Sequence, residues 1–340
     1  MFNSFGPIEW QDDRPLGALL PHTKLSEKAG KQLLGKIAYL MKNDVGKTSP
    51  GRAEGRQPCI KRQIPRRIIF HAERRNIRVK EQIARAFHAD KPILAMLHLG
   101  GYNPNEVHDR AKREIEQLYE NGVDAILAED YFGSPDDVEW ALDYLSANWP
   151  ERVYGLNLLS DPEKGFRLAM RYGAAFMQID SVCGHLRPGV HMKGDGIPNL
   201  YAKTCDGDFA DRLAELRAAY PVFLLGGVRF KYQPVRSGRS VEEDLALGRE
   251  RCDAVVVTGE GTGMNTGIEK IRRFRQALGD FPLFVGAGVT AATCREQLSI
   301  ADGAIVGSWF KQEGKTEAPV DAERVRQFMK IVQEARCMEK

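Results

Sequence analysis

Polar and ionisable side chains follow the short apolar runs of this sequence, at the points where buried strands would end. They are His98, Glu129, Asp130, Asn157, Asp180, Arg229, Lys231 and Thr258. Ionisable groups in such positions are costly to bury unless they serve a purpose. If the strands are parallel, their carboxyl ends meet at one edge, so these side chains would share one site. The pattern therefore favours an enzyme.

Two carboxylates of this set, Asp180 and Glu129, are candidates for general acid and base, with Asp130 as a third. Carboxylates that face each other across a closed site can acquire different pKa values, so that one donates a proton and the other accepts it. A structural ion pair is an equal alternative for Glu129 and Asp130. Lys231 is predicted to pair with a phosphate or carboxylate, since a Schiff-base role would need a strongly lowered pKa. His98 fits a catalytic role and a satisfied core histidine equally well.

Two glycine clusters form the most specific signal in the chain. Gly286 and Gly288 follow one apolar run, and Gly307 with Ser308 follows the next. A phosphate dianion needs several converging N–H donors with no Cβ atoms in the way, and such glycines can supply them. We therefore favour a phosphate site over tight turns alone.

A third glycine-rich stretch, Thr258–Gly263, follows the run before these two. Thr258 and Gly259 are candidate substrate or phosphate contacts, as is Asn157 on an earlier strand end. A lid that touches no ligand is an equal alternative for this loop. It is not a Walker loop, because no Gly-Lys-Ser/Thr follows at the required spacing.

No metal ion or other cofactor is predicted. His98, Glu129, Asp180, His185 and His191 carry atoms that can ligate a divalent metal ion, but neither the H-x-H nor the H-E-x-x-H spacing occurs. A divalent metal ion remains the weaker alternative.

The segments that would position these residues alternate regularly from about residue 79 onward. Apolar runs occur at 92–98, 124–130, 153–159, 175–181, 221–225, 253–259, 281–288 and 302–308, with helical patterns between them. Runs without polar alternation are typical of parallel strands that are covered on both faces. Eight strand–helix pairs match a (β/α)8 TIM barrel, whereas a doubly wound sheet usually has fewer strands. The sequence predicts such a barrel over residues 78–340.

Residues 1–77 form a different segment, predicted to be a basic extension. The formal net charge is +3, yet residues 47–86 carry 12 Lys/Arg against 3 Asp/Glu. Few aromatic residues interleave with these charges, so a solvated arm is favoured over a nucleic-acid partner. A helix is expected at 24–42. The rest is interpreted as a flexible arm, or as an upstream extension from a mis-chosen start codon.

Composition excludes several other classes. No stretch approaches 18 uncharged apolar residues, so no membrane span is predicted. No signal-peptide core is visible, and the six cysteines are scattered without a C-x-x-C motif. The sequence thus predicts a cytoplasmic protein with reduced thiols, and it leaves homo-oligomerisation open.

The chain also resembles the BtpA/SgcQ family of predicted TIM-barrel proteins. The resemblance rests on Lys91–Leu99, Asn121–Glu129, Ala254–Gly263, Phe284–Thr290 and Ala301–Ser308. It implies a barrel of the ribulose-phosphate-binding type, in a family with members linked to photosystem I biogenesis and to a sugar-uptake gene cluster. This chain departs from the family pattern at Asp130 and Asp180, where the family tends to have Asn, and at Gly227, where it tends to have Asp.

The favoured function is an enzyme that acts on a small phosphorylated metabolite, either a sugar phosphate or a nucleotide derivative. Isomerisation, lyase cleavage and glycosyl transfer all suit acid/base chemistry at the carboxyl-end mouth of the barrel. A non-catalytic assembly or biogenesis factor of the BtpA type is the alternative. A nucleic-acid or membrane-surface protein that acts through the basic arm is the third hypothesis.

Overall fold

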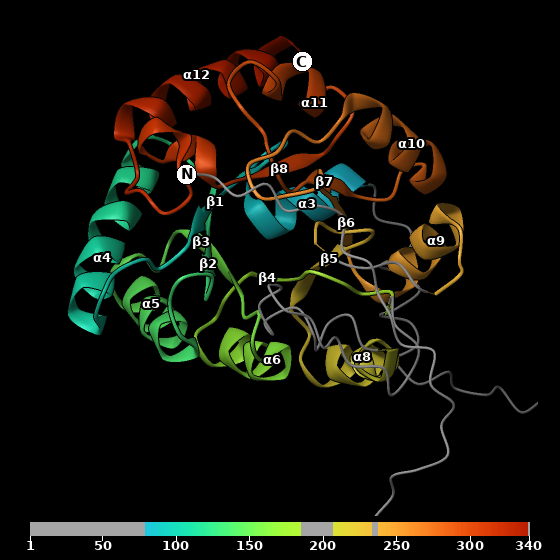
Figure 1. Ribbon diagram of the computed structural model, residues 1–340, viewed down its shortest axis with the longest axis horizontal. Coiled ribbons are helices and arrows are strands. Elements are labelled where there is room, and N and C mark those ends of the chain that lie inside the picture. The colour runs from blue at the N-terminus through green and yellow to red at the C-terminus, as the bar shows by residue number, and fades with distance from the viewer. Residues whose placement is uncertain (1–78, 185–206, 233–236, 339–340) are drawn as a thin grey trace, which may run out of the picture. The chain divides into compact units, whose positions relative to one another are not determined.

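Eight parallel strands close into a barrel in sequence order, β1 to β8, in the computed structural model (Figure 1). The structure describes residues 79–184, 207–232 and 237–338. The strands are β1 (Ile93–Leu97), β2 (Ala125–Glu129), β3 (Val153–Asn157), β4 (Phe176–Ile179), β5 (Phe223–Gly227), β6 (Ala254–Val257), β7 (Leu283–Val285) and β8 (Gly303–Val306). Closure comes from the pairing of Ile93 with Ala304 and of Ala95 with Val306. The predicted TIM barrel is confirmed.

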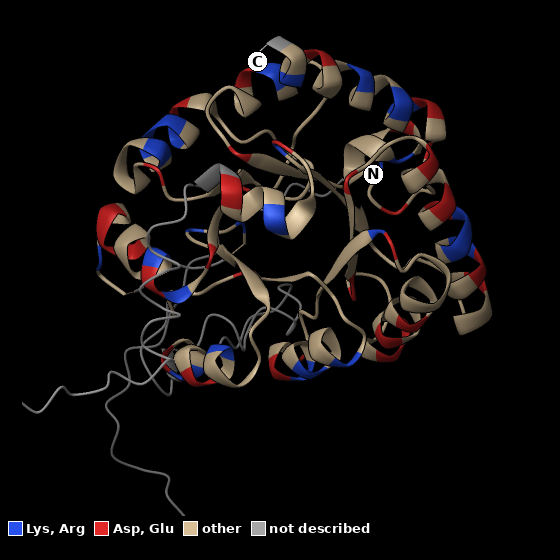
Figure 2. Cartoon of the chain, turned by 180° about the vertical axis from the view of Figure 1, so that it is seen from behind, with Lys and Arg blue, Asp and Glu red and all other residues tan. Residues whose placement is uncertain are grey.

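Helices surround the strands and cover their outer faces (Figure 1). They are α4 (Pro104–Glu120), α5 (Pro135–Asn148), α6 (Pro162–Arg171), α8 (Gly207–Ala219), α9 (Val241–Arg251), α10 (Ile268–Leu278), α11 (Cys294–Leu298) and α12 (Ala322–Met338). Two short 3-10 helices, η2 (Ser308–Phe310) and η3 (Gln312–Gly314), follow β8. Charged residues of both signs are spread over the outer helices, as Figure 2 shows. This arrangement leaves the strands buried on both faces, as their uninterrupted apolar sequence requires.

The helix starts follow from local sequence chemistry. Ser134 caps α5 in a reciprocal capping box with Asp137, and Pro135 occupies the first helical turn. Ser240 and Glu243 form the same box at the start of α9. Because such caps satisfy the free N–H groups of the first turn, each helix begins at a fixed residue after its loop.

An additional helix, α3 (Val79–Phe87), packs its apolar face against the interior of the barrel. Phe87 is 1% exposed, and its ring centroid lies 5.1 Å from that of Phe176 and 5.7 Å from that of Phe284. Ile83 joins the same cluster. These contacts close one end of the barrel and leave the opposite end, where the strands have their carboxyl ends, for a pocket.

Strand β5 ends two residues later than the sequence predicted, because two glycines continue it. A Cβ atom at Gly227 would lie 2.1 Å from the carbonyl oxygen of Asp180, and one at Gly226 would lie 2.7 Å from the Cβ of Cys252. Only glycine allows the backbones to approach this closely. The glycine pair is therefore part of the sheet and not the turn that follows it.

Several sequence predictions concern residues outside the described ranges. They are the basic extension over residues 1–77, its helix at 24–42, and the candidate ligands His185 and His191. Within the described ranges, no helix is long and apolar enough to span a bilayer.

We predict that Phe87→Ala lowers the free energy of unfolding by about 3–5 kcal/mol, because it leaves a cavity between three packed rings. Urea unfolding followed by circular dichroism would measure the loss. Tyr102→Ala is the control, since this aromatic side chain is fully exposed and its removal should change the value by at most about 0.5 kcal/mol. Equal values for the two variants would contradict the packing role of α3.

Candidate active site

A pocket opens at the carboxyl ends of the strands and gathers most of the predicted site. Its walls include seven of the predicted residues: His98, Glu129, Lys231, Gly286, Gly288, Gly307 and Ser308. Thr262 and Gly263, which belong to the predicted glycine-rich stretch 258–263, also line it. The other lining residues were not singled out from the sequence: Met96, Gln178, Phe230, Ala287, Val289, Thr290, Ile305, Trp309 and Gly314. One side of the pocket carries ionisable groups and the other carries glycine-rich backbone.

Buried carboxylates on the ionisable side are linked through side-chain amides. Asn157 Nδ2 donates to Glu129 Oε1 at 2.8 Å and to Asp180 Oδ1 at 2.9 Å. Gln178 Nε2 donates to the same Asp180 oxygen at 2.8 Å. All four side chains are at most 6% exposed. Glu129 and Gln178 reach the pocket, whereas Asp180 and Asn157 are not among the described residues that line it.

The environment of Glu129 favours its protonated form. Burial is the main reason that its pKa rises to about 8, and the charge of nearby Asp180 adds to the shift. Burial also raises the pKa of Asp180. Because two buried carboxyl groups linked through one amide resist double ionisation, this pair retains a proton near neutral pH. A carboxyl group with a pKa of about 8 can donate or accept a proton at physiological pH.

His98 lies beside Glu129 in the neutral form. Burial lowers its pKa well below the ordinary value, and the charges of Lys311 and Lys231 lower it further. Its Nε2 is 3.9 Å from Glu129 Oε2, which is too far for a hydrogen bond, and its ring packs against Tyr131. Its Nδ1 has no hydrogen-bond partner among the described residues. A neutral imidazole can meet a ligand as donor or acceptor.

Three loops converge on the glycine-rich side. Gly288 has φ +64°, and a Cβ there would lie 2.0 Å from the carbonyl oxygen of Met264 in the loop after β6. A Cβ at Gly263 of that loop would lie 3.2 Å from Ser308 Oγ, after β8. The loops after β6, β7 and β8 therefore touch only because glycine stands at these contacts.

The backbone N–H groups on this side differ in their use. Gly286 N–H donates to the carbonyl oxygen of Val257 at 2.8 Å, so this glycine offers space and not a donor. No acceptor within the described ranges is recorded for the N–H groups of Gly288, Gly307 and Ser308. Ser308 Oγ is 2.7 Å from Thr316 Oγ1. Free N–H groups in a glycine-rich concavity are suited to an anion.

Other predicted residues lie away from the pocket. Asp130 accepts hydrogen bonds from the N–H groups of Leu159 and Ser160 and from Ser160 Oγ, and so fixes the loop after β3. Thr258 Oγ1 accepts a hydrogen bond from the backbone N–H of Lys231 at 2.8 Å, so this hydroxyl holds the backbone of Lys231 and is not among the described lining of the pocket. Gly259 packs against the carbonyl oxygen of Asn265.

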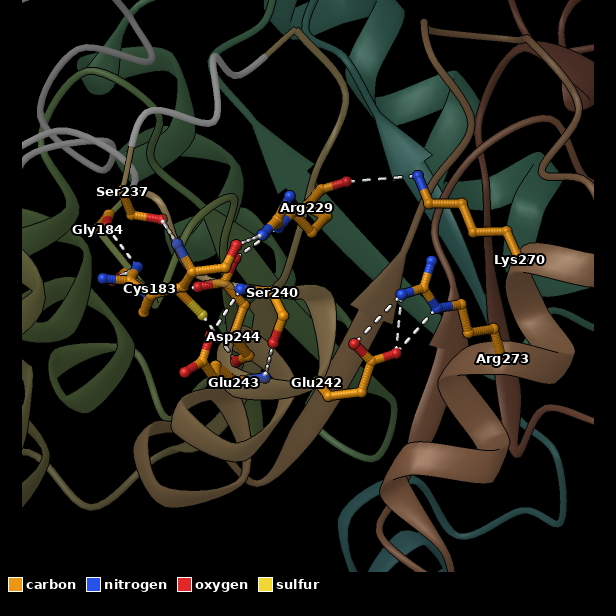
Figure 3. A network of polar contacts seen from close by, with 11 residues as sticks. Cys183, Gly184, Arg229, Ser237, Ser240, Glu242, Glu243, Asp244, Lys270 and Arg273 are labelled. Carbon is orange, nitrogen blue, oxygen red and sulfur yellow. Dashed lines mark hydrogen bonds and ion pairs between the residues drawn. The ribbon is translucent and has the colours of Figure 1, made fainter.

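Arg229 belongs to an ion network around the buried Asp244 that holds the loop after β5 (Figure 3). Its Nε donates to Asp244 Oδ2 at 2.5 Å, and Arg239 Nε donates to Oδ1 at 2.6 Å. Arg239 also donates to the carbonyl oxygens of Cys183 and Gly184 after β4. Because these contacts tie two neighbouring loops to α9, they help to fix the segment that presents Lys231.

A signal for Gln178 was present in the sequence. Successive side chains of a strand point to opposite faces, so a residue two positions before Asp180 shares its direction. Trp309 carried no such signal, because the loop that places it has no regular period. Among the described residues, no group of three His, Cys, Asp or Glu side chains could hold a metal ion.

A closed (β/α)8 barrel with a polar pocket at its carboxyl-end mouth defines a TIM-barrel protein. The chain belongs to the BtpA family, whose family model matches residues 89–334. The resemblance inferred from the sequence is thereby confirmed.

Relatives in this family cover nearly the full barrel. An uncharacterised protein of Methanocaldococcus jannaschii is 27% identical over 263 residues, which cover 71% of this chain and 95% of the relative. The putative sgc region protein SgcQ of Escherichia coli is 26% identical, with 73% and 96% covered. The photosystem I biogenesis protein BtpA of Synechocystis is 23% identical, with 73% and 90% covered.

The chain is also similar to solved structures at low identity. Phosphoribosyl anthranilate isomerase from Thermus thermophilus is 12% identical with a TM-score of 0.44, covering 72% of this chain and 98% of that one. Thiamine phosphate pyrophosphorylase from Pyrococcus furiosus is 13% identical with a TM-score of 0.46, covering 72% and 96%.

We predict that the stability of the wild type depends on pH through Glu129. Between pH 6.5 and 8 the folded chain keeps a proton that the unfolded glutamate has lost, so the free energy of unfolding falls as the pH rises. The fall should reach about 2 kcal/mol, at roughly 1.4 kcal/mol per pH unit. Urea unfolding at several pH values would measure it.

Glu129→Gln keeps the acceptor for Asn157 but cannot titrate, so its unfolding free energy should lack most of this fall. The pH range lies at or above the ordinary pKa of histidine, which limits the contribution of His98. Parallel curves for the two proteins would show that Glu129 is ionised throughout.

Proposed function

We propose that this protein is an enzyme that acts on a small phosphorylated metabolite by acid/base chemistry in the pocket described above. One observation carries the proposal: the buried carboxyl group of Glu129, whose pKa burial raises, lines the same pocket as glycine-rich backbone with N–H groups that have no backbone acceptor within the described ranges. The first can move a proton and the second can hold a phosphate.

The phosphate end lies at the loops after β6, β7 and β8. Gly288, Gly307 and Ser308 line this end, and their N–H groups have no backbone acceptor within the described ranges, which supports the assignment. Gly286 lines this end, and glycine is required there because a Cβ atom would lie 2.4 Å from Val256 Cγ1. Lys231 lines the same pocket and supplies the positive charge that a phosphate dianion attracts.

Proton transfer is assigned to Glu129, because it is the acidic residue that reaches the pocket among the described residues. Its protonated form serves as a general acid, and the form left after donation serves as a general base. Asp180 contributes through its charge, which helps to raise the pKa of Glu129, and Asn157 holds the two groups in place. Neutral His98 and cationic Lys231 are positioned to stabilise a developing oxyanion. Isomerisation, lyase cleavage and glycosyl transfer all use such steps.

The alternative is a non-catalytic assembly factor, because one relative carries the name of a photosystem I biogenesis protein. Such a factor would use an outer surface, and substitutions in the pocket would leave its cellular function intact. The two functions therefore differ in whether Glu129→Gln abolishes the cellular phenotype.

We predict that Gly307→Ala weakens binding of inorganic phosphate and of ribose 5-phosphate about 10-fold or more. Gly307 lines the pocket, and the methyl group of an alanine there would lie 3.0 Å from His98 Cε1 and narrow the pocket. Gly267→Ala is the matched control, because φ is −57° there and a Cβ meets no atom within 4 Å. Thermal-shift titration of all three proteins would measure binding.

Ser308→Asp provides a second variant, in which a negative charge at the proposed cradle should abolish protection by either ligand. If phosphate protects the wild type and both pocket variants equally, the phosphate lies elsewhere. If neither ligand protects the wild type at millimolar concentration, the proposed substrate class is wrong.

A further inference from the structure

Gln178 is a buried amide that projects from β4 into the pocket and has one polar atom to spare. The side chain is 4% exposed and lines the pocket, and its Nε2 is held by Asp180 Oδ1 at 2.8 Å. Its Oε1 is buried and has no hydrogen-bond partner among the described residues. We propose that Gln178 recognises a hydroxyl group of the substrate, which would make the substrate a polyhydroxylated phosphate ester. This inference rests on the proposed function, in which a phosphorylated small molecule fills the pocket.

The orientation of the Gln178 amide is fixed by its neighbours. Turning the amide over would place Oε1 against the Asp180 carboxyl oxygen, which already accepts from Asn157 Nδ2. Two such acceptors in contact repel each other, so the amide nitrogen must face Asp180. Oε1 is therefore held as a hydrogen-bond acceptor.

An acceptor left without a donor in a buried site destabilises the folded protein. Six buried side-chain atoms lack a partner within the described ranges, and three of them belong to residues of this one pocket: His98 Nδ1, Gln178 Oε1 and Trp309 Nε1. Such atoms are few in native structures, and their concentration at one site indicates that a ligand satisfies them.

The chemistry of the unpaired atoms restricts that ligand. Oε1 of Gln178 needs a donor, and a carboxylate, a carbonyl or a phosphate oxygen carries none at neutral pH. A substrate carboxylate at this place would also face the carboxyl groups of Glu129 and Asp180. An amine would donate, but Lys231 in the same pocket repels a cation. A hydroxyl group donates a hydrogen bond and carries no charge, so it meets both conditions.

The opposite wall offers the complementary chemistry. Trp309 follows β8 next to Ser308, and its Nε1–H is a donor without an acceptor within the described ranges. A suitable ligand would accept a hydrogen bond near β8 through a phosphate or hydroxyl oxygen and donate one near β4 through a hydroxyl group. It would then give a partner to Trp309 Nε1 and to Gln178 Oε1. A hydroxylated carbon chain that ends in a phosphate has this arrangement.

The test compares ligands that share a phosphate but differ in hydroxyl groups. Isothermal titration calorimetry would give Kd values of the full-length wild type for propyl phosphate, 3-aminopropyl phosphate, glycerol 3-phosphate and ribose 5-phosphate. We expect the wild type to prefer the hydroxylated esters over propyl phosphate by about 10-fold or more. Gln178→Leu, which is close in volume, should remove most of this preference and leave the Kd for propyl phosphate within about 2-fold.

Two further variants keep the result interpretable. Gln297→Leu is the matched control: it removes another buried glutamine with an unpartnered Oε1, outside the described lining of the pocket, and should keep the preference. Gln178→Asn keeps the amide but withdraws its carbonyl group by one methylene, so it should show an intermediate preference. This variant provides the test if Gln178→Leu fails to fold.

Each outcome bears on a different claim. If the wild type binds all the esters equally, or if Gln178→Leu keeps the preference, the hydroxyl inference is wrong while phosphate binding stands. Preference for 3-aminopropyl phosphate would show that the pocket selects an ammonium group in place of a hydroxyl group, and this result would also overturn the hydroxyl inference. If no phosphate ester binds the wild type, the proposed function fails and this inference fails with it.

Discussion

The pair of carboxyl groups at the carboxyl ends of β2 and β4, which both accept hydrogen bonds from Asn157, is the constraint on which the rest of the site depends. Glu129 and Asp180 are buried and joined through Asn157, so burial and mutual repulsion oppose their joint ionisation. Burying such a pair costs free energy, so its presence at the mouth of the barrel favours a functional role. The barrel makes the arrangement possible, because parallel strands bring residues that are far apart in the chain to one mouth.

The remainder of the mouth is organised around this pair. Glycines at positions 263 and 288 let three loops approach each other at one side of the pocket. The buried ion pair of Lys311 with Glu114 anchors the loop after β8 on α4, so Ser308 and Trp309 occupy fixed positions. In the proposed function, negative charge enters at the glycine side and proton transfer occurs at the carboxyl side.

The sequence predicted the barrel well because each strand and helix is marked by local features of its own segment, namely an apolar run, glycines or capping residues. It also predicted Glu129, Lys231 and the glycines that line the pocket, since residues at strand ends share one mouth. The sequence predicted less well the residues whose roles depend on contacts with neighbouring loops and strands. Asp130 directs its oxygens to the next loop, and Gly286 N–H is used within the barrel, which no spacing in the sequence reveals. Gln178 was overlooked although its alternation with Asp180 placed it on the inner face.

The most direct measurement is the titration of Glu129 itself, with and without inorganic phosphate. In protein labelled with ¹³C at the glutamate carboxyl carbon, the signal absent from Glu129→Gln identifies this residue by NMR. A midpoint near pH 8, which rises when phosphate adds negative charge to the same pocket, is the predicted result. A midpoint near the ordinary value for glutamate, unchanged by phosphate, would contradict both the retained proton and the shared site.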